Sequence, residues 1–578
     1  MANYYLKKKS SLARTLRQLV VLLSMLFLMA CSSDPLGDLN PFNSTALDEL
    51  NPFKEREDET DRGKIGFVRG FLGGVVVDEP RASIVGRDIL SSGGSAADVA
   101  VAVALTLAVT QPSSASLGGG GACVVYDSKT NSVETLDFLP RVPKREQSGA
   151  NSLISVPGTI RGLAMLHSRY GKLKWSQLVS PAENLARFGN PVSRAFASDL
   201  KKLPLAAWKN PEFRRIFSLR KGGGLIQEGA SLSQLDLSAT LGRIRVRGAG
   251  DFYTGLLGRD FIKAVEQAGS RLSFNDLRSY MPEWRPTLQV PFEKNTTFHF
   301  PITSGLSGVL AAQMIKILIK YGNWENLSSL DRMHLMAGIS KSINSYRTKW
   351  QLDDGTSSVP VSSLMSEDII EQLFFSYQAS QHIPKGSDKK TFHSPSPGTG
   401  VSFVTVDRNG SAVSCGLTLN KLFGSGKVAN GMGVLLSARP ELNGTGPESL
   451  AGVLLINSLH NIFYLAASAS GGPVSPSALV QVIANTLLKG EKGTLKHAIS
   501  EKRSHNGFES NLTYIEKGLG SKVIEGLTSK GHQLSPEQNL GLVNSIFCSS
   551  GIPNKRDGIL CVQHSDPRGF GLSSGTDR

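Results

Sequence analysis

The chain has 578 residues, of which 40% are hydrophobic and 60 are glycine, a composition that favours a large globular fold rich in turns. Its formal net charge is +15 at pH 7, but the basic residues are spread along the chain and form no stripe interleaved with aromatic residues. This distribution argues against nucleic acid as a partner and favours an ordinary basic surface.

The N-terminus has the features of an export signal. Several lysines and arginines precede an apolar run at residues 19–29, which is too short for a comfortable transmembrane helix. The run ends in Leu-Met-Ala-Cys and resembles a bacterial lipoprotein signal, with residues 1–30 as the signal peptide and Cys31 as the lipid-bearing residue. By the same resemblance, Ser32 after Cys31 implies sorting to the periplasmic face of the outer membrane, so we expect a lipid-anchored protein of the bacterial cell envelope. An uncleaved anchor or an ordinary cleaved signal is the alternative.

Residues 31–73 are polar and acidic, and they contain an internal repeat. Leu-Asn-Pro-Phe occurs at residues 39–42 and again at 50–53, each time just after an acidic residue. Proline at these positions disfavours a continuous helix. Two interpretations stay open: a flexible tether between lipid and domain, or a docking motif for an envelope protein partner.

The globular part is expected to begin at Gly74. The spacing of apolar residues predicts a helix at 82–90, and residues 96–109 are small and apolar on all sides, which predicts a fully buried helix. The glycines at 118–121 are expected to turn the chain into a buried strand at 123–126, which returns at 133–138 after a tight turn. This glycine run lacks the Lys-Ser/Thr of a phosphate-binding loop, so we do not interpret it as one.

A hairpin is predicted at residues 397–426. Strands at 401–407 and 411–419 flank the turn sequence Arg408-Asn409-Gly410, and a Ser/Pro/Gly loop precedes them. A strand that starts directly after such a loop could begin with a freed N-terminal threonine. Such a residue carries both a hydroxyl nucleophile and, in its α-amine, a base that titrates near neutral pH.

Four cysteines remain besides Cys31, and none forms a Cys-x-x-Cys pair, so we expect no zinc site and no other metal or cofactor. Cys548 and Cys561 flank a loop inside a predicted hairpin. In an oxidising compartment they could face each other and form a disulfide.

An ordered set of segments carries a family resemblance. GGSAADVAVAVALTLAVTQPSSASLGGGGACVVYD at 93–127 is the first. The others follow in order at 155–193, 251–255, 272–280, 301–308, 401–426, 469–473 and 564–568. Together they resemble γ-glutamyltranspeptidases over roughly residues 74–570. The resemblance implies an α/β (α+β) N-terminal nucleophile hydrolase with a four-layer αββα core, in which 74–398 is the large-subunit-like region and 399–578 the small-subunit-like region.

The resemblance also implies a reaction. Family members cut themselves before a threonine, which then attacks the γ-glutamyl amide of glutathione or a relative and passes the acyl group to water or an amino acid. Gly471 and Gly472 match the family's glycine pair, which supplies backbone donors to the oxyanion. Thr418 and Asn420 match positions that support the nucleophile.

The nucleophile itself is displaced. Counting back from Asp407 places the family's threonine on Gly400, and Thr399 lies one residue early. Side chains alternate along a strand, so this shift turns the hydroxyl to the opposite face unless Gly400 forms a bulge. Thr399 is therefore a loop residue, a displaced nucleophile rescued by a bulge, or a relic cleavage site.

The positions that bind substrate in the family are also changed. The carboxylate-binding arginine, the serine pair and the ammonium-binding aspartate fall at Leu139, at Leu450 with Ala451, and at Leu442. The nearest residues of suitable chemistry are displaced by one or two positions: Arg141, Ser449 and Glu441. Each lost charge-assisted contact should cost about 1.5–3 kcal/mol of binding free energy.

Three functions follow from these observations. The first is a non-catalytic or strongly impaired family member that acts in the envelope as a binding or scaffold protein. The second is an active γ-glutamyl hydrolase or transferase that uses Thr399 after self-cleavage and binds a γ-glutamyl small molecule. The third, less favoured, keeps the pocket for a different acyl substrate with Arg141 or Glu441 as displaced clamps.

Overall fold

The structure, a computed structural model, describes residues 71–143, 154–219, 223–293, 295–303, 305–321, 323–352, 356–377, 400–440, 450–490, 493–507, 512–552 and 561–575. They belong to one compact unit that spans residues 63–578. Several expected features lie outside the described residues: the signal peptide, Cys31, both Leu-Asn-Pro-Phe copies, Thr399, Glu441, Leu442 and Ser449.

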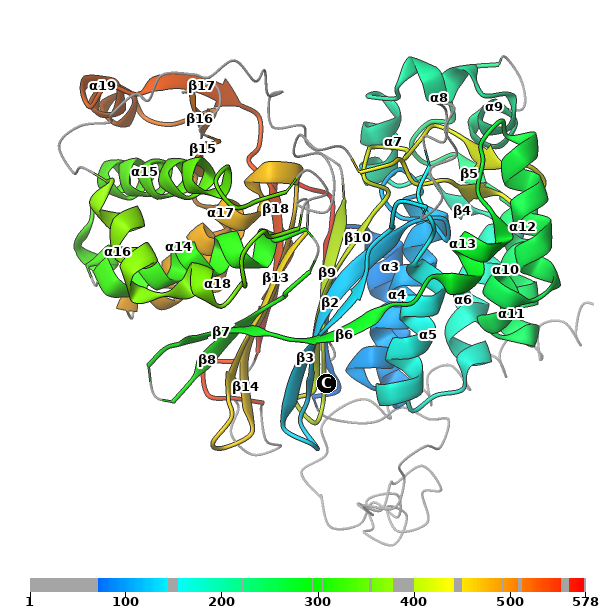
Figure 1. Ribbon diagram of the computed structural model, residues 1–578, viewed down its shortest axis with the longest axis horizontal. Helices are drawn as coiled ribbons and strands as arrows, with labels where there is room; N and C mark the ends of the chain where they lie inside the picture. The colour runs from blue at the N-terminus through cyan, green and yellow to red at the C-terminus, as the bar shows by residue number, and fades with distance from the viewer. Residues whose placement is uncertain are drawn as a thin grey trace, which may run out of the picture. The chain divides into compact units, whose positions relative to one another are not determined.

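Two antiparallel sheets form the centre of the molecule (Figure 1). The first has the order β20 (Leu572–Gly575), β1 (Gly73–Val77), β9 (Val401–Asp407), β10 (Ala412–Thr418), β2 (Gly120–Asp127), β3 (Ser132–Phe138) and β6 (Glu283–Pro286). The second has the order β19 (Val562–His564), β18 (Leu542–Phe547), β14 (Ile462–Ser470), β13 (Ala451–Asn457), β8 (Thr297–Phe300) and β7 (Leu288–Pro291).

Helices cover the outer face of each sheet. On the first sheet lie α3 (Pro80–Ser91), α4 (Ala96–Thr110) and α5 (Thr159–Tyr170), backed by α6 (Trp175–Phe188), α10 (Leu235–Arg247), α11 (Gly250–Thr254), α12 (Leu256–Gln267) and α13 (Phe274–Ser279). On the second lie α14 (Ser307–Tyr321), α17 (Ser475–Leu487) and α18 (Leu495–Ser500), backed by α15 (Ser329–Arg347) and α16 (Glu367–Phe375). Val404 and Val406 of β9 pack against Leu454 and Ala466 between the sheets. The expected four-layer αββα arrangement is confirmed.

Two smaller groups of elements complete the unit. One surrounds an aromatic cluster and comprises α7 (Arg194–Leu200), α8 (Leu205–Lys209), α9 (Pro211–Phe217), β4 (Asn190–Pro191), β5 (Ser231–Leu232), β11 (Val428–Ala429) and β12 (Val434–Leu435). The other is a three-stranded sheet of β15 (Ser504–Asn506), β16 (Leu512–Glu516) and β17 (Gln533–Glu537), with α19 (Ser521–Ser529).

Helix α4 begins where its sequence predicts. The Ser95 side chain accepts a hydrogen bond from the backbone N–H of Asp98, and the Asp98 side chain accepts one from the backbone N–H of Ser95. This capping box satisfies two of the donors that a helix N-terminus leaves unpaired. Every residue of α4 is buried. The helix can lie between β9, β10 and α6 because its side chains are small and apolar.

The glycine run at 118–121 is only partly a turn, which corrects the expectation. Gly120 and Gly121 already belong to β2 and pair with Thr418 and Leu417. A Cβ at Gly120 would lie 2.3 Å from the carbonyl oxygen of Phe138. The glycines therefore allow close packing of backbones at the start of the strand.

Both regions named from the family resemblance share the first sheet. β1, β2, β3 and β6 come from the first region, and β9, β10 and β20 come from the second. β1 begins at Gly73, one residue before the expected start of the globular part. The boundary at 398 and 399 thus separates two parts of one sheet rather than two separate domains.

Two disulfides lie within the described residues. Cys548 is bonded to Cys561, the pair that the sequence placed face to face. Cys123 is bonded to Cys415, a pairing that the sequence reasoning did not propose.

In the part of the chain that the structure describes, no helix is long and apolar enough to cross a membrane. The same residues contain no group of three or more His, Cys, Asp or Glu side chains placed to hold a metal ion.

Candidate functional site

Three strand ends meet at one edge of the two packed sheets. Ser468 Oγ of β14 donates to the carbonyl oxygen of Cys415 in β10 at 2.9 Å, which fixes the contact between the sheets. Both strands then run to the same edge and end at Thr418 and Ser470. Gly400, just before β9, lies at this edge too, because Ser402 pairs with Gly416.

The β9 ladder is regular. Its pairing with β1 and β10 proceeds without a shift from Val401 to Asp407. Val401 and Phe403 face α4, whereas Val404 and Val406 face the second sheet. Because successive residues of a strand point to opposite faces, position 400, which is a glycine, lies on the same face as Ser402. The expected alternative of a bulge at Gly400 that rescues Thr399 as nucleophile concerns Thr399, which lies outside the described residues.

Gly471 and Gly472 follow β14 directly and adopt positive φ angles of 128° and 74°. A Cβ at Gly471 would lie 2.8 Å from Cα of Gly541. Position 471 therefore needs glycine both for its backbone angle and for its close neighbour. The glycine at position 471, expected from the resemblance as an oxyanion donor, thus also has a packing role at this edge.

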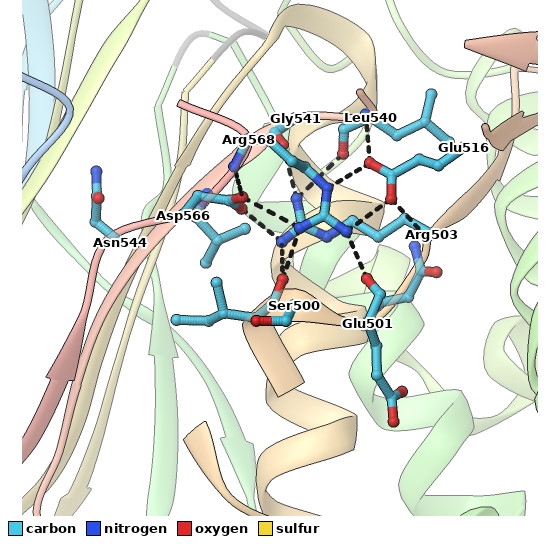
Figure 2. A network of polar contacts seen from close by, with 12 residues as sticks. Ser500, Glu501, Arg503, Glu516, Leu540, Gly541, Asn544, Asp566 and Arg568 are labelled. Atoms are coloured by element: carbon cyan, nitrogen blue, oxygen red, sulfur yellow. Dashed lines mark hydrogen bonds and ion pairs between the residues drawn. The ribbon is translucent and has the colours of Figure 1, made fainter. Parts of the chain in front are cut away.

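A buried ionic network supports the neighbour of Gly471 (Figure 2). Arg503, 1% exposed, donates to the carbonyl oxygen of Gly541 at 2.7 Å and to Asp566 Oδ2 at 2.6 Å. Asp566 Oδ2 also accepts from the backbone N–H of Val543 at 2.9 Å. Arg568 completes the network through ion pairs to Asp566 and Glu516. The segment at 564–568 thus anchors the loop before β18 against the glycine pair.

Thr418 and Asn420 are joined to each other at the end of β10. The backbone N–H of Asn420 donates to Thr418 Oγ1 at 2.9 Å, and Asn420 Nδ2 donates to the carbonyl oxygen of Ala438 at 2.8 Å. Asn420 Oδ1 and Ser437 Oγ are buried, and neither has a hydrogen-bond partner among the described residues. Burying a polar atom without a partner is costly, so these two atoms mark a place where a further polar group fits.

Asp78 is a buried carboxyl group at the same edge that the sequence reasoning missed. It follows β1 and accepts from the backbone N–H of Ser402 at 2.8 Å, from Asn544 Nδ2 at 2.8 Å and from Ser470 Oγ at 3.0 Å. Burial raises the pKa of Asp78 to about 6, these hydrogen bonds oppose the rise, and nearby Asp566 adds to it. The carboxyl thus connects four strand ends, β1, β9, β14 and β18. Its signal in the sequence was a charged residue directly after an all-apolar strand.

Two buried leucines occupy positions where the family resemblance expects polar residues. Leu139 is 1% exposed and Leu450 is 5% exposed. The Leu450 side chain lies against β10, since a Cβ at Gly416 would be only 2.6 Å from Leu450 Cδ2. Both side chains are therefore withdrawn from solvent, and that of Leu450 packs against β10.

Arg141, the displaced candidate for the carboxylate clamp, is engaged elsewhere. Its Nη2 lies 2.6 Å from Glu283 Oε1, and its guanidinium lies 5.5 Å from the centroid of the Tyr280 ring. Burial raises the pKa of Glu283, but Arg141 and Arg285 outweigh it and the net shift is downward. Of the substrate-binding residues proposed from the sequence, Arg141 is the described one, and its charge is already paired.

A cavity of about 160 Å³ lies at the other end of β9. It is lined by residues that include Ser95, Tyr170, Lys172, Asp407 and Ser411. Asp407 Oδ2 there accepts a hydrogen bond from the backbone N–H of Ala96 at 3.2 Å. This cavity is separated from the glycine pair by the length of the strand and is not the candidate site.

Comparison with known proteins decides the family. The sequence profile described as "Gamma-glutamyltranspeptidase" matches residues 82–442 and 447–575. The chain belongs to the gamma-glutamyltranspeptidase family. The match is interrupted between 442 and 447, so a count back from Gly471 without gaps does not fix the position at Leu442.

Relatives share sequence over most of their length. The glutathione hydrolase proenzyme of Pseudomonas aeruginosa is 29% identical over 86% of this chain and 94% of that protein. The glutathione hydrolase proenzyme of Escherichia coli is 26% identical over 87% and 91%, and scoloptoxin SSD14 of Scolopendra dehaani is 26% identical over 86% and 91%.

A solved structure shares the fold of the whole unit. The cephalosporin acylase of Bacillus halodurans superposes with a TM-score of 0.71 at 20% identity, over 90% of this chain and 99% of that chain. The expected N-terminal nucleophile hydrolase fold is therefore confirmed. At this sequence identity, the superposition supports a conclusion about the fold alone.

Proposed function

We propose that this protein is a gamma-glutamyltranspeptidase-family member of the cell envelope that does not turn over γ-glutamyl compounds, or does so only weakly. The observation that carries this proposal is the pair of buried leucines, Leu139 and Leu450. They stand where the resemblance expects the carboxylate-binding arginine and the first serine. A substrate carboxylate placed against a buried leucine at either position would lose its hydration without gaining a charge-assisted partner.

A second candidate function is an active γ-glutamyl hydrolase or transferase that uses Thr399 as its nucleophile after self-cleavage. The retained backbone of Gly471 and Gly472 favours it, because backbone N–H groups are suitable donors to an oxyanion. The unpartnered Asn420 Oδ1 and Ser437 Oγ favour it as well, because they leave polar atoms for a ligand or for the start of the small-subunit-like region. We rank it second because Arg141, the one candidate clamp among the described residues, is paired with Glu283, and a donor pair alone gives little binding energy.

Release of glutamate from glutathione separates the two candidates. The mature chain and Thr399→Ala are assayed side by side, with the Escherichia coli glutathione hydrolase proenzyme as a positive control. The proposal expects the same background rate for both forms of this chain. A rate well above that of Thr399→Ala would establish the active enzyme.

The envelope location is part of the proposal. We propose that Cys31 carries lipid and that the Leu-Asn-Pro-Phe copies at 39–42 and 50–53 bind an envelope protein, with the flexible tether as the alternative. Incorporation of labelled palmitate into the wild-type chain, and its loss in Cys31→Ala, would support the anchor. Labelling that persists in Cys31→Ala would contradict it.

A further inference from the structure

The disulfide between Cys123 and Cys415 joins two strands that are far apart in the chain. The residues are separated by 292 positions and stand directly opposite each other where β2 pairs with β10. Cys123 belongs to the large-subunit-like region and Cys415 to the small-subunit-like region. By contrast, Cys548 and Cys561 are 13 residues apart and both lie in the small-subunit-like region.

The bond is enclosed by the fold. Cys123 and Cys415 are each 1% exposed, and both belong to the apolar core that lies between the first sheet and α4. A reductant in solution therefore reaches this disulfide only when the core opens.

We propose that the Cys123–Cys415 disulfide makes the two subunit-like regions one covalent unit, whether or not the peptide chain between them is cut. The pairing of β10 with β2 brings the two thiols together when the uncut chain folds its first sheet. Exchange with a disulfide-bonded oxidant of the oxidising compartment then forms the Cys123–Cys415 bond, and the oxidant takes up the two electrons and two protons as two thiols. A later cut near residue 398 then leaves both regions attached through the centre of that sheet. The proposal does not rest on the absence of catalysis, because it concerns the connection and not the cut.

A designed cut tests this connection. A recognition sequence for a specific protease is inserted between Gly386 and Ser387 of the full chain, which is produced in an oxidising compartment and cut. The denatured product, treated with a thiol-blocking reagent, is run on a gel without and with reductant. We expect one band at full length without reductant and two bands with it. Two bands without reductant would overturn the proposal.

Matched variants identify the bond responsible. In the same background, Cys548→Ala with Cys561→Ala removes a disulfide within one region, so the cut chain should still run as one band without reductant. Cys123→Ala with Cys415→Ala should give two bands under both conditions. If this variant does not fold, a peptide map of the unreduced wild type decides, because it must contain a cross-linked pair with Cys123 and Cys415. Free Cys123 or Cys415 in that map would refute the proposal.

Unfolding of the cut protein gives a second readout. With the disulfide, the two regions stay one molecule, so the urea midpoint should not change over a tenfold range of protein concentration. Without it, unfolding also separates two chains, and the midpoint should rise with concentration. A midpoint that depends on concentration in the cut wild type would contradict the covalent connection. Self-cleavage of the natural chain would disprove the proposed lack of catalysis but leave all these expectations unchanged.

Discussion

Asn544 Nδ2 donates a hydrogen bond of 2.8 Å to Asp78 Oδ1, while Asn544 Oδ1 is buried without a partner among the described residues. The amide nitrogen is therefore placed to donate a hydrogen bond to an ionised Asp78. Rotation of the amide to present its oxygen to a protonated Asp78 would break the hydrogen bonds that Asn544 Nδ2 also donates to Ser402. Because burial raises the pKa of Asp78 to about 6, we expect the stability of this edge to depend on pH.

Asp78→Asn should remove a pH-dependent cost of folding. The pKa of Asp78 in the folded state, about 6, exceeds its ordinary value of 3.8, so the carboxyl penalises the folded state as the pH rises through this window. The free energy of unfolding of the wild type should fall by up to about 3 kcal/mol relative to Asp78→Asn between pH 4 and pH 7. Urea unfolding at pH 4, 5, 6 and 7 measures the difference.

The exposed Asp88 offers a control for this comparison, because its side chain is 62% exposed. Asp88→Asn should follow the wild type at each pH within about 0.5 kcal/mol. A constant difference between wild type and Asp78→Asn across the window would show that Asp78 is not the titrating group.

Gly471→Ala should destabilise the fold, because it adds a Cβ at a φ of 128° and 2.8 Å from Cα of Gly541. We expect a loss of about 2–4 kcal/mol in the free energy of unfolding. Gly248→Ala is the matched control: its φ of 80° is also positive, but nothing lies within 4 Å of the added Cβ. It should cost about 1 kcal/mol. Equal losses of unfolding free energy in both variants would mean that the backbone at Gly541 moves away at no cost, so that the close contact is not a constraint.

Arg503→Leu should cost about 3–5 kcal/mol of unfolding free energy, because it removes one of the two arginine partners of the buried Asp566 and the donor to the carbonyl oxygen of Gly541. Arg194→Leu breaks the exposed pair with Glu228 and should cost less than about 1 kcal/mol. Chemical unfolding of both variants at pH 7 gives the comparison. A loss at Arg503 as small as that at Arg194 would contradict the supporting role of the network.

Leu450→Ala should cost about 2–4 kcal/mol, because Leu450 is buried against Gly416 and its removal leaves a cavity. The exposed Leu459 provides the control, and Leu459→Ala should change stability by less than about 0.5 kcal/mol. A negligible loss at Leu450 would indicate that its side chain lines an open site instead of filling the edge, which would weaken the proposed function.

Local sequence patterns predicted the central elements well. The buried helix expected at 96–109 is α4, and the strands expected at 401–407 and 411–419 are β9 and β10 within a residue at each end. The Cys548–Cys561 disulfide could be predicted from the sequence because a short loop brings the two residues together. Such features depend on neighbours in the chain and are therefore visible in the sequence.

Features that depend on sheet order were not visible. The bond between Cys123 and Cys415 requires β10 to lie beside β2, and the role of Asp78 requires β1, β9, β14 and β18 to end at one edge. The sequence showed that Arg141 was displaced, but only the structure shows its pairing with Glu283. Contacts between distant segments carry no local pattern, which is why the site could be predicted only in part.

The most direct test of the proposed lack of catalysis is a denaturing gel of the mature chain with reductant present, because the Cys123–Cys415 bond would hide a cut without it. We expect a single band at full length and no new N-terminus within the chain. Two bands, with the smaller fragment beginning at Thr399, would contradict it.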